Sequence, residues 1–320
     1  MILVLRALGV GDLATAVPAL RGLRRAHPDE PVVLAAPRWL APLAELTGAV
    51  DELLPCDGLG GTLPELHPAV AVNLHGRGPQ SHSLLRSTLP RRLLAFGTSG
   101  ISGTTRTSGT SGISGGPQWR LDEHEVLRWC RMLQWYGIDC DCDDLALDRP
   151  ASPRPGATVV HPGAKSGLRR WPPERFAATA RTLAAAGHDV VVTGSAAEAG
   201  LARGVAEQAG LPPTAVLAGV TGLRDLAGLV GHARLLISGD TGIAHLATAY
   251  GTPSVVLFGP VPPRLWGPPP DRQQHVAIWR GRRAEPGDTL SDRPHPALLA
   301  VEVGEVIAAA HRIARTAATH

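Results

Sequence analysis

The sequence feature that most constrains the fold is an alternation of short apolar segments with amphipathic helices, separated by turns that contain glycine. Residues 1–5 are apolar, Gly9 and Gly11 follow, and apolar side chains then recur at helical spacing over residues 13–24. The same order recurs several times after residue 157. Because strands that alternate with helices form parallel sheets covered on both faces, the sequence predicts an α/β fold with doubly wound sheets.

Each half of the chain carries its own series of these segments. We expect strands at residues 1–5, 31–35, 69–74, 158–161, 189–193, 215–217, 234–238 and 254–258, and helices at 13–24, 40–46, 122–136, 174–186, 197–209, 223–230, from 243, and at 303–310. A proline-rich run at 148–156 separates the two series, and 320 residues suffice for two domains of about 150 residues. The sequence therefore predicts domains at 1–150 and 151–300 and a terminal helix within 301–320.

Residues 97–116 interrupt the first series. Gly, Ser or Thr occupies 17 of these 20 positions, and the hexapeptide Thr-Ser-Gly-Ile-Ser-Gly occurs twice. Such a segment buries too little apolar surface to offset the entropy of ordering it, so the composition predicts a flexible loop. A lid over a ligand is the functional alternative.

The composition excludes several classes of protein. With 44 % apolar residues and a net charge of +3, the chain is neither disordered nor a strongly basic nucleic-acid binder. Its four irregularly spaced cysteines match neither a zinc site nor a disulfide framework, and we expect them to be reduced. The apolar runs are shorter than the ~18 residues of a transmembrane helix, so we expect a cytoplasmic protein; peripheral association with a membrane stays open.

Ligands of doubly wound sheets bind where the carboxyl ends of strands meet helix N-termini, so the turns after strands are the candidate sites. The first turn, Leu8-Gly-Val-Gly-Asp12, places an acid at the start of a helix. Asp12 is either a helix cap or a general base, and the residues alone favour the cap. The turn lacks the third glycine of a dinucleotide-binding motif.

Two turns in the second half contain charged groups near helix starts. Arg169 and Arg170 precede a helix and form either a diphosphate site or a solvated pair of cations. Gly194 ends a strand shortly before Glu198. Glu198 is either a first-turn acid that complements the helix dipole or a hydrogen-bond partner for a hydroxyl of a bound donor.

A further turn, Ser238-Gly-Asp-Thr-Gly-Ile-Ala-His245, is the strongest candidate. The amides of Thr241 and Gly242 and the hydroxyl of Thr241 are suited to an anion at a helix N-terminus. Asp240 is a candidate cap, and His245 is either a packing residue or a ligand contact. We expect no metal site, because no His/Asp cluster has ligand spacing.

Taken together, these motifs resemble glycosyltransferase family 9, the ADP-heptose heptosyltransferases of bacterial surface polysaccharides. The resemblance covers nearly the whole chain. It is carried by LGVGD at 8–12 and PAL at 18–20, LHG at 74–76, HPG at 161–163, RRWP at 169–172, TGS at 193–195, SGDTGIAHLA at 238–247 and GTPSVVLFGP at 251–260. The block that begins at Ser238 is the most specific to the family.

The resemblance implies a GT-B fold, in which two Rossmann-like domains face a cleft. The first domain would bind the acceptor, the second the nucleotide-sugar donor, and the final helix would pack back on the first domain. It further implies inverting transfer of a sugar, heptose from ADP-heptose, to a glycan or small-molecule acceptor, as in lipopolysaccharide core biosynthesis, without a metal ion or other cofactor. Asp12 falls on the family's general base, which reverses the preference for a cap.

The remaining site residues are also expectations from the resemblance. The donor would contact Arg169, Arg170, Gly194, Glu198, Asp240, Thr241, Gly242 and His245, and the acceptor Gly11, His75 and Arg77. The family usually has Lys at the position of Arg169, a change that keeps the charge and adds bidentate reach. A GT-B-like nucleotide-sugar epimerase and a non-catalytic nucleotide-sugar binder stay as alternatives.

Overall fold

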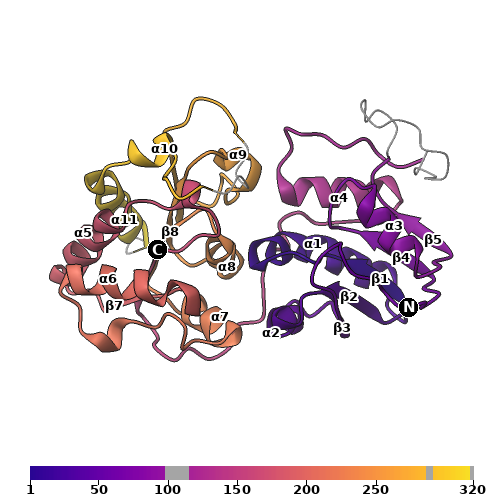
Figure 1. The fold of residues 1–320 in the computed structure, drawn as a ribbon, viewed down its shortest axis with the longest axis horizontal. Helices are drawn as coiled ribbons and strands as arrows, with labels where there is room; N and C mark the ends of the chain where they lie inside the picture. The colour runs from indigo at the N-terminus through magenta and orange to yellow at the C-terminus, as the bar shows by residue number, and fades with distance from the viewer. Residues whose placement is uncertain (98–114, 286–290, 318–320) are drawn as a thin grey trace. The chain divides into compact units, whose positions relative to one another are not determined.

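The structure is a computed structural model that describes residues 1–97, 115–285 and 291–317. The chain divides into two compact units, Met1–Asp148 and Arg149–His320, each with its own sheet (Figure 1). The division falls at the start of the proline-rich run, next to the expected boundary at residue 150. Most of the glycine-rich loop expected at 97–116, residues 98–114, lies outside the described residues.

The first unit is built on a five-stranded parallel sheet (Figure 1). Its elements are β1 (Ile2–Leu5), α1 (Val10–Ala26), β2 (Val32–Ala36), η1 (Arg38–Leu40), α2 (Ala41–Glu45), β3 (Glu52–Pro55), β4 (Val70–Asn73), α3 (Gln80–Arg86), β5 (Arg92–Leu94) and α4 (Glu125–Trp135). The strand order is β3-β2-β1-β4-β5, and Leu5 at the end of β1 pairs with Ala35 and Asn73. The direction of winding therefore reverses between β1 and β4, whose following loops lie side by side.

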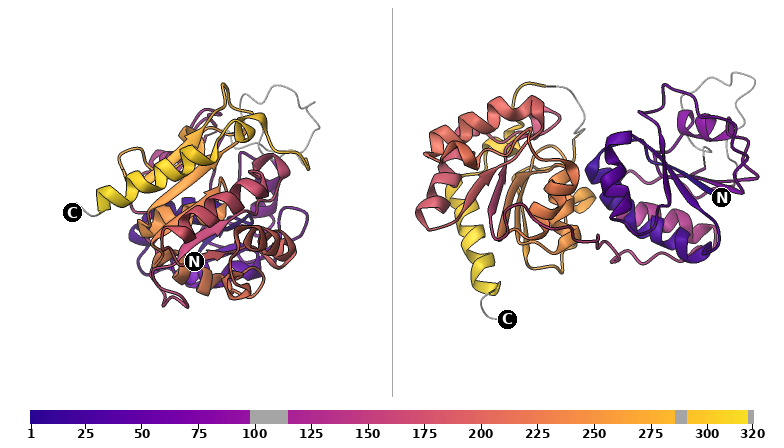
Figure 2. Two further views of the ribbon diagram at one scale, coloured as in Figure 1. Left: turned by 90° about the vertical axis from the view of Figure 1, so that its left-hand side faces the viewer. Right: turned by 90° about the horizontal axis from the view of Figure 1, so that it is seen from below.

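The central strand β1 is buried on both of its faces. Leu3 and Leu5 join Leu84 of α3 in one buried cluster, while Ile2 and Val4, which point the opposite way, are also fully buried. Helices α1 and α4 pack against each other (Figure 2). Burial on both faces requires apolar side chains at successive positions, which is why the opening residues predict a strand.

The second unit is built on another five-stranded parallel sheet (Figure 1). Its elements are β6 (Thr158–His161), η2 (Gly167–Arg169), α5 (Pro173–Ala185), β7 (Val190–Val192), η3 (Ala196–Glu198), α6 (Ala199–Ala209), η4 (Pro213–Ala215), α7 (Leu223–Gly231), β8 (Leu235–Gly239), α8 (Gly242–Tyr250), β9 (Ser254–Phe258), α9 (Pro263–Trp266), β10 (His275–Trp279), α10 (Pro296–Leu299) and α11 (Val303–Ala317). The strand order is β10-β9-β8-β6-β7, so the winding reverses between β6 and β8.

The two faces of this second sheet have separate apolar contacts. Phe176 of α5, Val205 of α6 and Val306 of α11 join Leu257 of β9 in one large buried cluster. Phe258, the next residue along β9, belongs to another cluster that includes α8. Figure 2 shows helices on both sides of these strands, so the predicted doubly wound arrangement is confirmed in this unit.

The terminal helix packs within the second unit. It contacts α5, β9 and β10, and Val306 and Ile313 lie in the buried cluster of that unit. These apolar side chains complete the cover over β9 and β10. The packing of this helix on the first domain, which the resemblance implied, stays a prediction.

Several strands also differ from the expectation. β3, β5 and β10 were not predicted. β3 and β5 are short edge strands in which only Leu94 is buried, so their apolar pattern is weak. The strand expected at residues 215–217 is reduced to one bridge between Val192 and Val216. Residues 213–215 form the short helix η4 instead, and the chain becomes extended only at Val216.

The sequence predicts four reduced cysteines, and this prediction is wrong for two of them. Cys130 in α4 and Cys140 form a disulfide, with their Cα atoms 5.1 Å apart. The turn at Gly137 reverses the chain and brings the two residues within the usual bridging distance. Cys56 and Cys142 are free thiols. Within the described ranges, no helix is long and apolar enough to cross a membrane.

We predict that His82 makes the first unit sensitive to acid. Its side chain on α3 is buried, and neither ring nitrogen has a hydrogen-bond partner among the described residues. Burial, helped by the charge of Arg86, lowers the pKa of His82 from 6.5 to about 4. Because the unfolded chain binds the proton more readily, the free energy of unfolding should fall by about 3 kcal/mol as the pH drops from 6.5 to 4.

The His82→Phe variant keeps a ring in the same space but does not titrate. Urea unfolding at pH 7.5 and pH 4 measures the loss of stability in both proteins. The variant should lose less stability than the parent by about 3 kcal/mol. An equal loss in the two proteins would show that His82 is not the source of the acid sensitivity.

Candidate functional site

Four of the residues singled out in the sequence lie where each sheet reverses its winding. In the first unit, Asp12 follows β1 and His75 follows β4, and these strands are neighbours. In the second unit, Arg169 follows β6 and Asp240 follows β8, which are also neighbours. Doubly wound sheets bind ligands at this position because adjacent loops diverge there. The topology therefore marks one ligand-binding region in each unit.

Asp12 is held at both oxygens in the first turn of α1. The N-cap is Gly9, whose backbone N–H donates a 3.1 Å hydrogen bond to Oδ2 of Asp12. Oδ1 lies 3.5 Å from Nη2 of Arg6, and the Asp12 side chain is 28 % exposed. Asp12 is therefore not the N-cap itself. It is an oriented carboxylate that solvent still reaches, which a base acting on a bound hydroxyl requires.

His75 lies beside this carboxylate. Its Nδ1 accepts a 3.2 Å hydrogen bond from the backbone N–H of Ala7, so Nε2 carries the ring proton. Burial and the charge of Arg6 lower the pKa of His75, whereas the charge of Asp12 acts in the opposite direction. Near neutral pH the ring is thus an uncharged hydrogen-bond donor.

The other two residues expected at the acceptor differ in their access to solvent. Gly11 is buried as the second residue of α1. Arg77 is exposed in the loop after β4, the same loop that carries His75. Of these two residues, Arg77 is the one whose side chain is available to an anionic group on a ligand.

In the second unit, the loops after β6 and β8 are joined by an ion pair. Nη1 of Arg169, the last residue of η2, lies 3.7 Å from Oδ2 of Asp240, whose side chain is 6 % exposed. The backbone N–H of Asp240 donates a 3.0 Å hydrogen bond to the Leu257 carbonyl, which fixes its place next to β9. A Cβ at Gly239 would lie 2.9 Å from the Arg169 carbonyl oxygen, so these two loops approach closely only with glycine there.

Two hydroxyl groups near the N-terminus of α8 have no hydrogen-bond partner among the described residues. Thr241 is the N-cap and Gly242 the first helical residue. The hydroxyl oxygens of Thr241 and Ser238 are buried and accept or donate no hydrogen bond within the described part of the chain. Buried polar atoms are rarely left unpaired, so a ligand oxygen at this helix end would satisfy them. The ring of His245, on the same helix, forms a T-shaped contact with the Trp266 ring, with 5.9 Å between the centroids.

Glu198 is fixed at the end of η3. Its Oε2 accepts hydrogen bonds of 2.9 and 2.8 Å from the backbone N–H and the hydroxyl of Ser195. Burial acts to raise the pKa of Glu198, but these hydrogen bonds and the charge of Arg170 hold it below its usual value. The carboxylate lies against Gly163, where a Cβ would collide with it. Glu198 is therefore an ionised acid held beside the loop that follows β6.

Gly194 and Arg170 complete this group of loops. The Gly194 carbonyl accepts a 3.0 Å hydrogen bond from Gly219, and a Cβ on Gly194 would lie 3.2 Å from Cβ of Glu198. Nε of Arg170 donates a 2.9 Å hydrogen bond to the Ala164 carbonyl. The predicted donor residues of the loops after β6, β7 and β8 thus lie at one edge of the second sheet.

Sequence reasoning missed a buried ionic group behind Asp12. Arg6 is 1 % exposed and Glu125 is 4 % exposed. One signal in the sequence could have revealed Arg6: it is an arginine placed directly after an entirely apolar strand. Glu125, by contrast, resembled an ordinary acid in the first turn of a helix, and its partner is 119 residues away.

Comparison with known proteins identifies the family of the chain. The profile of glycosyltransferase family 9 (heptosyltransferase) matches residues 129–289, half of the chain. The chain belongs to glycosyltransferase family 9. Lipopolysaccharide heptosyltransferase 3 of Escherichia coli is 30 % identical over 164 residues, which are 50 % of this chain and 48 % of that protein. Lipopolysaccharide heptosyltransferase 2 of Salmonella typhimurium is 26 % identical over 98 % of both chains.

This family 9 chain thus aligns with about half the length of the first of these relatives. Among solved structures, the E. coli ADP-heptose lps heptosyltransferase II has a TM-score of 0.73 at 20 % identity, with 98 % of both chains covered. This likeness confirms the predicted GT-B fold class of two doubly wound parallel sheets.

Proposed function

We propose that this family 9 protein is an inverting heptosyltransferase that transfers heptose from ADP-heptose to a hydroxyl group of a lipopolysaccharide core glycan. The observation that carries the proposal is the oriented, solvent-accessible Asp12 carboxylate at the winding reversal of the first sheet. Family membership supports the reaction class. The relatives' names, which mention lipopolysaccharide and ADP-heptose, support the choice of acceptor and donor.

In this proposal Asp12 is the general base. Its carboxylate takes the proton of the acceptor hydroxyl while the hydroxyl oxygen forms a bond to the anomeric carbon of the sugar. The bond between that carbon and the β-phosphate oxygen breaks, and its electron pair leaves with ADP. His75 would donate a hydrogen bond from Nε2 and orient the acceptor. The configuration at the anomeric carbon inverts, because the acceptor attacks opposite the leaving group.

The second unit would bind the donor. Arg169 supplies a cation for the diphosphate, and the amides of Thr241 and Gly242 stabilise the charge that develops on the leaving oxygen. The unpartnered Thr241 hydroxyl adds a further donor to a phosphate oxygen. Glu198, ionised and fixed by Ser195, would accept hydrogen bonds from the ribose hydroxyls. No step in this scheme uses a metal ion.

A thermal-shift screen tests the identity of the donor. ADP and ADP-heptose, added at about 100 times their Kd, should raise the Tm by about 5 °C or more, because a ligand that binds only the native state stabilises it. UDP-glucose and GDP-mannose at the same concentrations should shift the Tm much less. A larger shift with a UDP- or GDP-sugar would contradict the assignment of ADP-heptose.

A further inference from the structure

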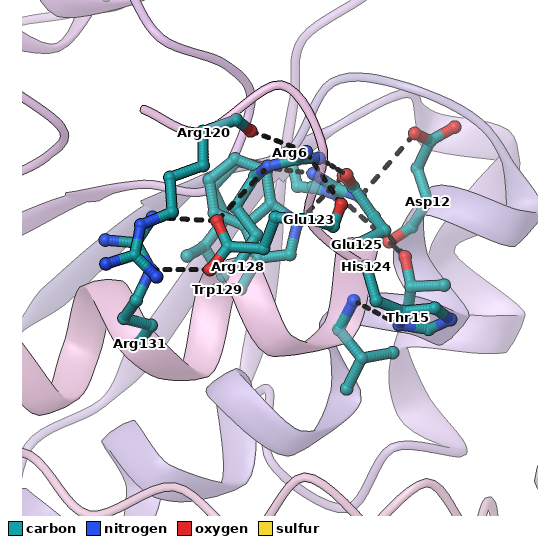
Figure 3. A network of polar contacts seen from close by, with 12 residues as sticks. Arg6, Asp12, Thr15, Arg120, Glu123, His124, Glu125, Arg128, Trp129 and Arg131 are labelled. Carbon is teal, nitrogen blue, oxygen red and sulfur yellow. Dashed lines mark hydrogen bonds and ion pairs between the residues drawn. The ribbon is translucent and has the colours of Figure 1, made fainter. Parts of the chain in front are cut away.

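Arg6 occupies a buried position directly behind the proposed base. It follows β1, and every nitrogen of its guanidinium group has a partner (Figure 3). Nε donates to the Asp12 carbonyl at 2.9 Å, Nη1 donates to the Leu74 carbonyl, and Nη2 donates to the Thr15 hydroxyl at 3.3 Å. With 1 % of the side chain exposed, Arg6 has no surface left for a substrate. Any effect of Arg6 on the reaction therefore passes through another residue.

Nη2 of Arg6 lies between two carboxylates. Oε1 of Glu125 accepts a hydrogen bond from it at 3.0 Å, whereas Oδ1 of Asp12 lies 3.5 Å away (Figure 3). The guanidinium carbon also lies 4.8 Å from the centre of the Trp129 ring. Glu125 and Trp129 both come from α4, so the first turn of α4 and the first turn of α1 meet at one arginine.

Glu125 is itself an ionised, fixed group. It forms ion pairs with Arg6 and Arg128 and accepts a 2.9 Å hydrogen bond from Nε1 of Trp129. Burial acts to raise the pKa of Glu125, but the charges of Arg6 and Arg128 keep it below the usual value. Glu125 is thus a constant negative charge beside Arg6 at neutral pH.

The sharing of Arg6 between Glu125 and Asp12 affects how well Asp12 can act as a base. An arginine paired only with Asp12 would bind that carboxylate tightly and weaken it as a proton acceptor, since an adjacent cation favours the charged form. The nearer contact with Glu125 absorbs part of the charge of Arg6. Arg6 can then fix the direction of Asp12 through a contact that is longer than its hydrogen bond to Glu125.

We propose that Arg6 and Glu125 are positioning residues for Asp12. Glu125 anchors Arg6 and shares its charge, and Arg6 holds the Asp12 carboxylate in the orientation needed for proton transfer. This inference rests on the general-base role proposed above for Asp12. Under this inference the start of α4 takes part in the reaction through Glu125, which acts on Asp12 by way of Arg6 and does not contact the substrate.

Steady-state kinetics of Glu125→Gln test the inference, with ADP-heptose as donor and delipidated lipopolysaccharide core oligosaccharide as acceptor. The substitution keeps the shape of the side chain but removes its charge. We expect kcat to fall about 10²-fold, which is the usual effect of a misplaced catalytic group, and the KM for ADP-heptose to stay unchanged. Glu123→Gln is the matched control, because Glu123 forms ion pairs with Arg131 and Arg128 in the same network. The control should keep its kcat.

A double-mutant cycle shows whether the effect passes through Asp12. In the Asp12→Asn background, Glu125→Gln should cause no further loss of the residual rate, because the group that it positions is already gone. Thr15→Val removes one hydrogen-bond acceptor of Arg6 and preserves side-chain shape. It should lower kcat about fivefold, as expected for the loss of one long hydrogen bond from Arg6 to a neutral acceptor. If Glu125→Gln does not fold, Thr15→Val takes its place in the same cycle.

The outcomes separate this inference from the proposed function. If Asp12→Asn abolishes transfer but Glu125→Gln and Thr15→Val keep the parent kcat, the positioning role is wrong and the base role stands. Multiplicative losses in the double mutants would also overturn the positioning role, because they would show action independent of Asp12. If Asp12→Asn keeps the parent kcat, the base role itself is wrong and the inference falls with it.

Discussion

Asp12→Asn should lower kcat for heptose transfer by about 10²–10⁴-fold, the usual contribution of a general base, and leave the Kd for ADP unchanged. Asparagine keeps an oxygen that can accept the hydrogen bond from Gly9, so the first turn of α1 should stay intact. The amide group cannot take a proton from the acceptor hydroxyl. The effect should therefore appear in kcat, and isothermal titration calorimetry with ADP should give the affinity of the parent protein.

Asp225→Asn is the matched control for this prediction. Asp225 is the third residue of α7 after an N-cap glycine, Gly222, just as Asp12 is the third residue of α1 after Gly9. Both substitutions remove a negative charge from a first helical turn, where it interacts favourably with the helix dipole. Only Asp12→Asn should reduce kcat. Equal losses in the two variants would mean that helix stability, and not proton transfer, accounts for the effect.

The second large effect is expected for Arg169→Ala. The substitution removes the cation that joins the loops after β6 and β8 and that we assign to the diphosphate. Charge-assisted hydrogen bonds contribute about 1.5–3 kcal/mol each, so the Kd for ADP should rise by about 10–100-fold. Calorimetric titration with ADP measures this directly. Arg169→Lys keeps the charge but loses the planar fork, and its Kd should lie between those of the parent and the alanine variant.

Arg154→Ala controls for the general loss of positive charge in the second unit. Arg154 forms an ion pair with Asp189 on the surface. Asp189 directly precedes β7, so this pair lies at the start of the strand, away from the carboxyl end where the donor site is proposed. Its removal should leave the Kd for ADP unchanged. If the Kd for ADP is the same in Arg169→Ala and Arg154→Ala, the assignment of Arg169 to the donor site is wrong.

The central strands of both sheets could be predicted because burial on both faces imposes continuous apolar runs. Residues 2–5 and 254–258 are buried without exception and were recognised. The edge strand β3 has exposed or half-buried side chains and gives no such signal. The packing of α11 could not be read from its periodicity, because an amphipathic pattern shows that one face is buried but not which surface covers it.

Part of the candidate site followed from local rules. Turns after strands contain the ligand groups of doubly wound sheets, and this rule made Asp12, Arg169 and Asp240 candidates. Their assigned roles came from the resemblance to the family. The ion pair between Arg6 and Glu125 joins residues that are 119 positions apart, and no local pattern connects them. The capping role of Glu198 toward Ser195 was within reach, because a serine followed three residues later by glutamate is the pattern of a capping box.

The most direct test of the account is a single incubation of the protein with ADP-heptose, with and without a delipidated lipopolysaccharide core oligosaccharide. ADP release and mass spectrometry of the oligosaccharide measure donor consumption and transfer together. The account predicts ADP release that depends on the acceptor and equals the amount of heptosylated oligosaccharide formed, with the new bond inverted relative to the donor by NMR. Conversion of ADP-heptose to another sugar nucleotide without an acceptor, or transfer with retained configuration, would contradict it.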